Sequence, residues 1–290
     1  MLTWCINSYR NLPYLKLAIE SIRKNAYYKN SPIIVYTEND SETGNWIKSQ
    51  SDITPIIEFN PIPKGIGGGA NVAISHVKTE FFSLLHSDMY ISRHYDKVLL
   101  DIARTDEPTV ACSWRCEPDI WHQPSRMGTT MIPDNVDDGF GVYWHDFQSE
   151  NFEAFADDFV NANNIVFRKV EGVSYVMKKK DWDFIGGNDP LYAPTSWEDM
   201  DLHLRMAYHN YNFVVTSKAL VWHFGSRGAN FMDQPDKITK RSERQLKAEQ
   251  DNAQKFVGKW GELPQFDEYG FIILTPTLRE KCQKLYLLKT

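Results

Sequence analysis

The sequence predicts an α/β domain with a mostly parallel central sheet flanked by helices. Three observations favour this class. Segments typical of strands and of helices alternate from residue 2 to residue 88, which is the order that builds a parallel sheet. The run Phe81–Leu85 is almost wholly apolar and turns polar at His86, as in a strand buried on both faces. The 290 residues are 42% hydrophobic, which is enough for one large domain or for one domain with an elaboration.

The first half of the chain contains the clearest alternation. We expect strands at residues 2–7, 32–37, 53–59 and 81–85, and helices at residues 14–22, 44–50 and 65–77. In the first of these helices Leu15, Ala18, Ile19 and Ile22 recur at helical spacing, and Pro13 suits a first helical turn. This half therefore carries the α/β prediction.

A glycine-rich stretch, Gly65–Asn71, begins the third expected helix. It is similar to a phosphate-cradling loop, but it lacks the Lys-Ser/Thr ending of a P-loop and follows a proline-rich loop rather than a strand. Close packing of the backbone at a helix N-terminus explains the glycines at least as well. Both interpretations stay open at this point.

The second half of the chain is less regular. After a helix at 93–103 and a strand at 109–114, the stretch 116–141 has few periodic apolar positions, and a loop this long is usually functional or mobile. A helix at 152–160, a strand at 173–177 and a short helix at 181–185 follow, with Lys178–Lys180 as a solvated edge. Residues 213–216 and 219–222 are expected to form paired strands. A polar helix at 236–260 with a narrow apolar seam then leads into a packed tail.

A helix expected at residues 197–208 opens with three carboxylates, at Glu198, Asp199 and Asp201. Ser196 is a suitable N-cap, and acidic side chains in a first turn interact favourably with the helix dipole. Capping explains why this turn is acidic, but not why three carboxylates lie within four residues. The cluster is therefore a candidate functional site.

Composition restricts the classes of function. The net charge of −6 argues against a general binder of polyanions, although it allows a local basic groove. The first residues lead directly into a strand, so we expect no signal peptide, no transmembrane helix and a cytoplasmic location. Cys5, Cys112, Cys116 and Cys282 form no disulfide framework, and the Cys112–Cys116 pair is either a metal site or two reduced structural thiols.

Asp88 lies just after the apolar strand at residues 81–85. Ligands of open α/β sheets bind beyond the carboxyl ends of the strands, and a carboxylate there can hold a divalent cation against a diphosphate. Alternatively, Asp88 only caps the following turn.

The order of these features resembles the family 2 glycosyltransferases, which have the GT-A fold, over roughly residues 3–227. The resemblance rests on the loop Asn7–Asn11, the strand end Glu38–Ser41, the glycine-rich Gly65–Asn71, the metal motif ending at Asp88, the acceptor-side Gly186–Pro190 and Trp197–Leu202, and the late Val221–His223. It implies a catalytic domain at 1–230, with a nucleotide-sugar half at 1–110 and an acceptor half at 111–230. Residues 231–290 would then form a C-terminal helical extension packed on that domain.

The resemblance also implies roles for individual residues. Asp88 and His223 would bind Mn²⁺ or Mg²⁺, and Asp199 would be the catalytic base of an inverting transfer, with Glu198 as second choice. The residues implied in donor binding are Ser8, Tyr9, Arg10, Glu38, Asp40, Gly68, Asn71, His86, Ser87 and Arg227. Those implied on the acceptor side are Trp121, Trp197 and Asp201, although Asp201 can equally hold its helix in place.

One departure from the family motif lies at His86, where the first acidic metal ligand is expected. His86 can contact the ribose or the metal, or neither. The implied donor is a nucleotide-diphosphate sugar, with uridine preferred from the habit of the family alone. Acceptor recognition is expected in the irregular stretch that contains Trp121, His122 and Arg126.

Several functions compete with this interpretation. A sugar nucleotidyltransferase is disfavoured because the first loop lacks the Gly-rich, Arg- and Lys-bearing pattern of such enzymes. A non-catalytic carbohydrate- or nucleotide-sugar-binding protein is supported only by His86. The acceptor can be a polysaccharide, a glycolipid or another glycan. A modified base in DNA is the alternative, and would need a basic groove such as Lys178–Lys180 with Arg241 and Arg244.

Overall fold

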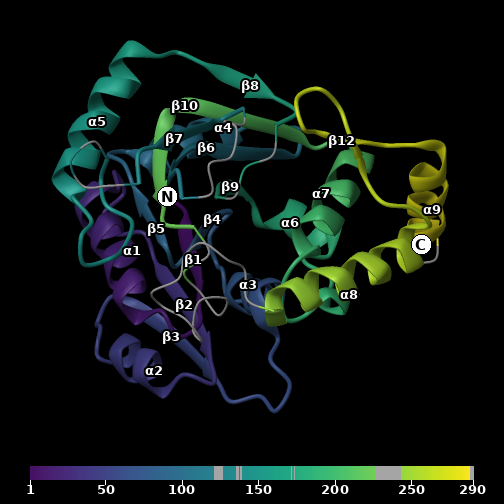
Figure 1. Cartoon of the computed structure of the whole chain (residues 1–290), viewed down its shortest axis with the longest axis horizontal. Coiled ribbons are helices and arrows are strands. Elements are labelled where there is room, and N and C mark those ends of the chain that lie inside the picture. Colours follow the sequence, from purple (N-terminus) through teal and green to yellow (C-terminus); the bar gives the residue numbers. More distant parts are fainter. Residues whose placement is uncertain are drawn as a thin grey trace.

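The computed structural model describes residues 1–120, 127–134, 137, 139–170, 172, 174–225, 227 and 243–287. Within these residues a ten-stranded mixed sheet forms the centre, and a separate two-stranded hairpin lies near the C-terminus (Figure 1). The main strand order is β3-β2-β1-β4-β9-β6-β10-β5, with β7 paired to β6 and β8 paired to β10.

The first half alternates strands and helices as expected. In chain order its elements are β1 (Thr3–Ser8), α1 (Leu12–Asn25), β2 (Ile33–Glu38), α2 (Ser41–Lys48), β3 (Ile53–Glu58), α3 (Gly65–Ser75) and β4 (Phe81–His86). Strands β3, β2, β1 and β4 pair in parallel, so Ile6 lies between Val35 and Leu85. Pro13 lies in the first turn of α1, as predicted.

The core lies on both faces of this sheet. Successive residues of a strand point to opposite faces, and in β1 the side chains of Trp4 and Ile6 join one buried cluster while Cys5 joins the other. Helices α1 and α2 contribute to the cluster of Trp4, and α3 contributes to that of Cys5. Strands buried on both faces explain the nearly continuous apolar runs of the sequence.

The second half of the sheet is mixed. Its elements are β5 (Met89–Ile91), α4 (Tyr95–Ala103), β6 (Thr109–Pro118), β7 (Thr129–Ile132), α5 (Ser149–Ala162), β8 (Val166–Arg168), β9 (Tyr175–Lys178), α6 (Lys179–Ile185), the 3₁₀ helix η1 (Pro190–Tyr192), α7 (Glu198–Tyr208) and β10 (Asn212–His223). Strand β9 is antiparallel to β4 and β6, whereas β10 is parallel to β6.

Four local predictions are wrong. The expected pair of strands at residues 213–223 is one strand, β10, whose register with β6 shifts between Thr216 and Leu220. Part of the stretch expected to be irregular is ordered, because β6 continues to Pro118 and pairs with β7.

Ser196 does not cap α7, since Trp197 is the residue before Glu198. Lys178 is buried rather than solvated, and its ammonium group donates to the carbonyl of Thr105.

The C-terminal part contains α8 (Glu243–Trp260), β11 (Gln265–Phe266), β12 (Ile272–Ile273) and α9 (Pro276–Leu287). In Figure 1 it lies at the end of the molecule opposite α1 and α2. Phe256 and Trp260 of α8 form a small core with Leu204 of α7 and Leu278 of α9. The C-terminal segment is therefore packed, as predicted.

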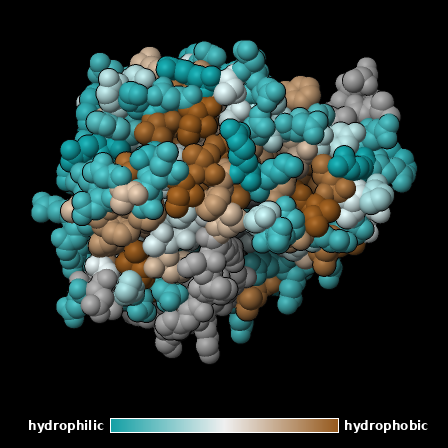
Figure 2. All heavy atoms as spheres, turned by 90° about the horizontal axis from the view of Figure 1, so that it is seen from above, coloured by the Kyte–Doolittle hydropathy of each residue, from teal (hydrophilic) through white to brown (hydrophobic). Residues whose placement is uncertain are grey.

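Aromatic side chains also gather on the side of α5 and β8. Trp114 lies 5.6 Å from Phe159 and 5.6 Å from Phe167, measured between ring centroids. The face seen from above carries apolar patches among hydrophilic side chains (Figure 2).

Among the helices that the structure describes, none has the length and apolarity that a membrane crossing requires. All four cysteines are free and buried, which favours structural thiols.

Candidate functional site

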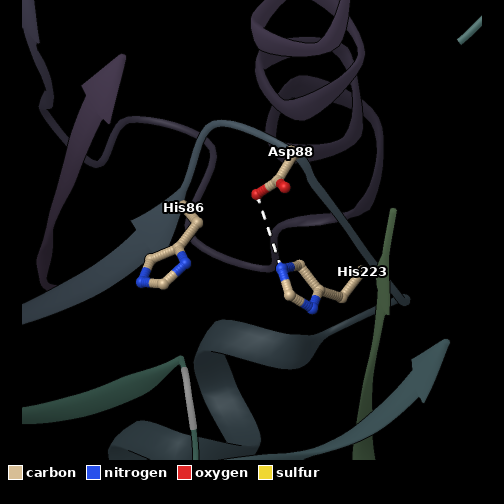
Figure 3. A group of neighbouring side chains, drawn as sticks. All are labelled: His86, Asp88 and His223. Carbon is tan, nitrogen blue, oxygen red and sulfur yellow. Dashed lines mark ion pairs between the residues drawn. The ribbon is translucent and has the colours of Figure 1, made fainter. Parts of the chain in front are cut away.

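The ends of β4 and β10 bring His86, Asp88 and His223 together. His86 ends β4, Asp88 lies in the turn before β5, and His223 ends β10, where it pairs with Met89. The possible ligand atoms of the three side chains lie within 4.8 Å of one another, and Nε2 of His223 is 3.6 Å from Oδ1 of Asp88 (Figure 3). His86 is thus a third possible ligand beside the predicted pair Asp88 and His223.

Glu117 contacts the ring nitrogen of His223 that points away from Asp88. Its Oε1 atom lies 2.5 Å from Nδ1 of His223, and Nε of Arg115 is 3.4 Å from the same oxygen. A carboxylate on one imidazole nitrogen leaves the other nitrogen as the metal ligand and orients the ring. Sequence analysis missed Glu117 because the predicted strand ended at Trp114, four residues before the observed end at Pro118.

The electrostatics of this group suit a cation. Burial lowers the pKa of His86, so its imidazole is neutral and keeps a lone pair for a ligand bond. Burial alone would lower the pKa of His223, but Asp88 and Glu117 outweigh it and the net pKa is raised. Imidazole nitrogens and a carboxylate oxygen are ordinary ligands of divalent metal ions in proteins. The donor set therefore fits a divalent cation.

Arg227 supports Asp88 through its backbone. Its amide donates to Oδ2 of Asp88 at 2.9 Å, which leaves Oδ1 facing His223. The guanidinium donates to the carbonyl of Val142 at 2.8 Å and lies 5.1 Å from the ring of Tyr143. Arg227 is buried and does not line the cavity described next, so direct donor contact by its side chain is not supported.

A cavity of about 390 Å³ connects this group with the acidic start of α7. Its walls include His86, Asp88 and His223, and also Glu198 and Asp199. Two candidate sites, whose residues lie at 86–88 and 223 and at 198–199, therefore face one space.

Glu198 and Asp199 differ in their surroundings. Oε2 of Glu198 is sealed from solvent and has no hydrogen-bond partner among the described residues. Burial, followed by the charge of Asp199, raises the pKa of Glu198 to about 8. Asp199 is exposed, and its Oδ1 accepts from the amide of Met200 at 2.8 Å. Burial therefore favours the protonated form of Glu198, and Asp199 is the accessible carboxyl group.

The predicted donor residues fall into two groups. Tyr9, Glu38, His86 and Ser87 line the cavity, whereas Ser8, Arg10, Asp40, Gly68, Asn71 and Arg227 do not. Ser8 donates to Asn11 at 2.7 Å, and Asp40 caps α2 through the amide of Thr43 at 3.1 Å. These side chains support the wall of the site rather than form it.

Arg10, Gly68 and Asn71 are also engaged outside the cavity. The amide of Arg10 donates to Asp40 at 2.8 Å, and a Cβ at Gly68 would lie 2.7 Å from Cβ of Lys64. Asn71 donates to the carbonyl of Asn188 at 2.8 Å and accepts from its amide at 2.9 Å. Asn71 thus ties α3 to the segment before η1.

The acceptor-side predictions are only partly placed. Trp197 packs against Phe256, with ring centroids 5.2 Å apart, and does not line the cavity. Asp201 is fully buried and pairs with Arg205 at 2.8 Å and Lys259 at 2.5 Å, so it holds the helix and cannot reach an acceptor. Trp121, with His122 and Arg126, lies outside the described residues.

The glycine-rich start of α3 is a packing feature. A Cβ at Gly67 would lie 2.9 Å from Cβ of Asn188 and 3.2 Å from Cβ of Glu198. The amides of Lys64 and Gly65 donate to the carboxylate of Glu38 at 2.9 and 2.7 Å. Because Glu38 already occupies this helix N-terminus, the close-packing interpretation holds and a phosphate cradle does not.

Other lining residues had no pattern that singled them out in the sequence. They are Tyr175 of β9, His203 of α7, and Gln245 and Ala248 of α8. Long-range packing places them at the cavity, and a single sequence carries no local pattern for that.

Comparisons with known proteins identify the family and the fold. The family model described as glycosyl transferase family 2 matches residues 3–163, more than half of the chain, and no curated protein matches. A structure of GalNAc-T7 with UDP, GalNAc and Mn²⁺ is 13% identical, with a TM-score of 0.57 over 93% of this chain and 49% of that one. Residues 1–349 of S. aureus TarS are 13% identical, with a TM-score of 0.50 over 77% of this chain and 60% of that one.

This chain therefore spans about half of GalNAc-T7 and three fifths of the TarS fragment. At such low identity the likeness shows the fold alone, and it confirms the GT-A fold predicted from the sequence. The match over residues 3–163 shows more: the chain belongs to glycosyl transferase family 2.

Proposed function

We propose that this protein is an inverting, metal-dependent glycosyltransferase that moves a sugar from a nucleotide-diphosphate donor to a hydroxyl acceptor. One observation carries the proposal. A single cavity is lined both by the His86–Asp88–His223 group and by the carboxyl pair Glu198–Asp199. These are the two functions that the reaction needs, charge stabilisation at the leaving group and a base at the attacking hydroxyl.

The leaving group is the first requirement. A divalent cation bound by His86, Asp88 and His223 would act as a Lewis acid on the diphosphate that departs. Glu117 orients His223 toward that position, and the backbone of Arg227 orients Asp88. His223 and Asp88 are thus held in place before a donor arrives, which reduces the cost of ordering on binding.

The base is the second requirement. Asp199 is exposed within the cavity and can accept the proton of an acceptor hydroxyl. Burial favours the protonated form of Glu198, which is a poor proton acceptor, so we assign the base to Asp199. A base that activates the nucleophile opposite the leaving group leads to inversion at the anomeric carbon.

The donor half supports a nucleotide. Tyr9, Glu38 and Ser87 line the cavity beside His86. GalNAc-T7, a protein of similar fold, was solved with UDP and Mn²⁺, which favours a uridine donor here as well. We therefore propose a UDP-sugar.

The acceptor is proposed to be an uncharged glycan hydroxyl. The described lining of the cavity holds four carboxyl groups and neither Lys nor Arg, which disfavours a polyanion such as DNA. Lys178 is buried, so it cannot contribute to the basic groove that a DNA acceptor would need. Arg241 and the side chain of Arg244 lie outside the described residues.

A donor panel tests the proposal. The protein is incubated with Mn²⁺, simple mono- and disaccharides, and UDP-glucose, UDP-N-acetylglucosamine or GDP-mannose. Release of the nucleotide is followed, and NMR reads the anomeric configuration of the product. Asp199→Asn should lower turnover about 100-fold or more while binding of UDP is kept, because a general base contributes about 10²–10⁴-fold. Nucleotide binding without turnover in the wild type would instead indicate a non-catalytic binding protein.

A further inference from the structure

One face of the C-terminal helix α8 contacts the cavity and the segments around α7 at three positions along the helix. Gln245, Asn252 and Lys259 are seven residues apart, and seven residues make almost two full helical turns, so the three side chains share a face. Gln245 lines the cavity, Asn252 contacts the segment before α7, and Lys259 pairs with Asp189 and Asp201. Neither the family match over residues 3–163 nor the sequence motifs involve this helix.

The contacts of Asn252 are unusual for one side chain. Asn252 is 1% exposed, and its Nδ2 group donates to the carbonyls of Tyr192, Thr195 and Ser196 at 2.8, 2.8 and 3.0 Å. Lys255 donates to Oδ1 of Asn252 at 2.7 Å, which fixes the orientation of the amide. The three carbonyls thus converge on one buried donor.

The segment that Asn252 holds has a strained backbone. Ser196 and Trp197 have φ angles of 74° and 75°, so two successive non-glycine residues adopt the left-handed region. Such conformations persist only where the surroundings determine them, and they gather at functional sites. Glu198 follows directly, and Thr195 and Ser196 themselves line the cavity.

We propose that Asn252 is a positioning residue for glycosyl transfer: by gathering the carbonyls of residues 192, 195 and 196, it sets the position of the carboxyl pair Glu198–Asp199. The inference rests on the proposed function and deepens it. The C-terminal helix becomes part of the acceptor side of the active site. The metal group, which lies at the ends of β4 and β10 and in the turn after β4, stays independent of it.

The test compares Asn252→Ala and the milder Asn252→Ser, which keeps one hydroxyl donor, with the wild type. Gln254→Ala is the matched control, because Gln254 is an exposed amide on the same helix. The donor is the most active of UDP-glucose, UDP-N-acetylglucosamine and GDP-mannose, with Mn²⁺ and the mono- or disaccharide acceptor that gives the highest turnover. We measure kcat and KM for nucleotide release, the Kd of the nucleotide with Mn²⁺, and hydrogen exchange of residues 195–201.

We expect kcat of Asn252→Ala to fall about 10- to 100-fold, because an error of about 1 Å in a reacting group has this effect. The KM for the donor and the Kd of the nucleotide should stay within about twofold of the wild-type values. Amide hydrogen exchange at residues 195–201 should become faster. Asn252→Ser should lie between Asn252→Ala and the wild type, and Gln254→Ala should match the wild type. A merely structural role would lower Tm without this separation of kcat from KM.

Two results would overturn the inference. A folded Asn252→Ser variant with wild-type kcat would show that the clamp does not position the carboxyl pair. Parallel losses of kcat and of nucleotide binding would show a global effect instead. A wild type that releases no nucleotide from any of the three donors would remove the proposed function itself, and the positioning role with it.

Discussion

Glu117 shows how one carboxylate outside the metal group can determine its affinity. The residue contacts Nδ1 of His223 and also pairs with Arg115, so its carboxylate is held against the ring. Glu117→Gln should lower the affinity for Mn²⁺ about 10- to 100-fold, the usual effect of losing such a support. Isothermal titration with Mn²⁺ measures the change. Glu80→Gln is the control, since Glu80 is exposed at the opposite end of β4; equal affinities for the two variants would exclude the role given to Glu117.

The carboxyl pair leads to a pH-dependent prediction. Burial and Asp199 raise the pKa of Glu198 to about 8, whereas an unfolded glutamate titrates near about 4.3. Between these values the unfolded state loses a proton that the folded state keeps, so the stability supplied by Glu198 declines as pH rises. Glutamine cannot ionise and resembles the protonated acid. The Tm of Glu198→Gln relative to the wild type should therefore increase from pH 4.3 to pH 8 and then level off.

Activity separates the two carboxyl groups further. Glu198→Gln should keep turnover at pH 7 within a few-fold, because the mutant side chain mimics the protonated form, whereas Asp199→Asn should not. A thermal-shift series across pH and a turnover assay give both readouts. A Tm difference independent of pH, or loss of turnover in Glu198→Gln at pH 7, would contradict the protonation state assigned to Glu198.

At the scale of elements, the glycine-rich helix α3 allows α7 to approach. Gly67→Ala places a methyl group 2.9 Å from Asn188, which must shift, and 3.2 Å from Glu198 at the start of α7, which must give by a few tenths of an ångström. We expect about a tenfold loss of kcat and a stability cost of about 1–3 kcal/mol. Gly258→Ala in α8 meets nothing within 4 Å and should stabilise by about 0.5–1 kcal/mol. Kinetics and denaturant titrations measure both variants, and an unaffected kcat in Gly67→Ala would count against this packing role.

The sequence predicts those elements whose pattern is local. The run Phe81–Leu85 and its polar end were recognisable because burial on both faces leaves only apolar residues in a strand. The continuity of β10 and the pairing of β6 with β7 depend on partners distant in the chain, so the local pattern predicts two strands at residues 213–216 and 219–222 where the structure has one. Glu117 was missed for the same reason, since its role follows from the pairing of β6 with β10.

The candidate site was predictable where the family motif is contiguous. Asp88, His223, Glu198 and Asp199 could be placed by resemblance, and all four line the cavity. His203, Gln245 and the clamp residue Asn252 belong to no motif. They reach the site only because α7 and α8 pack together, which no local periodicity specifies.

At the scale of the whole molecule, Lys259 joins the C-terminal helix α8 to helix α7 and to the segment before η1. Its ammonium group pairs with Asp201, which is fully buried, and with Asp189. Lys259→Met should destabilise the protein by about 3 kcal/mol, because it leaves buried negative charge with one cation fewer. Lys284→Met removes an exposed pair with Glu280 and should change stability by less than about 0.5 kcal/mol. Urea unfolding compares them; equal stabilities would show that the two parts are not coupled through this ion pair.

The central claim is that a divalent cation at His86, Asp88 and His223 joins the protein to the diphosphate of its donor. The most direct measurement is a thermal-shift panel of UDP, GDP, CMP and dTDP, each with Mn²⁺ and again with EDTA. Asp88→Asn is the matched variant, because it keeps an oxygen for the amide of Arg227.

We expect one nucleoside diphosphate to raise Tm with Mn²⁺, because at 100 times its Kd it adds about 2.7 kcal/mol to the free energy of unfolding. The increase should disappear with EDTA and in Asp88→Asn, and CMP, which has no diphosphate, should give little. A nucleotide shift that survives both EDTA and Asp88→Asn would contradict the account.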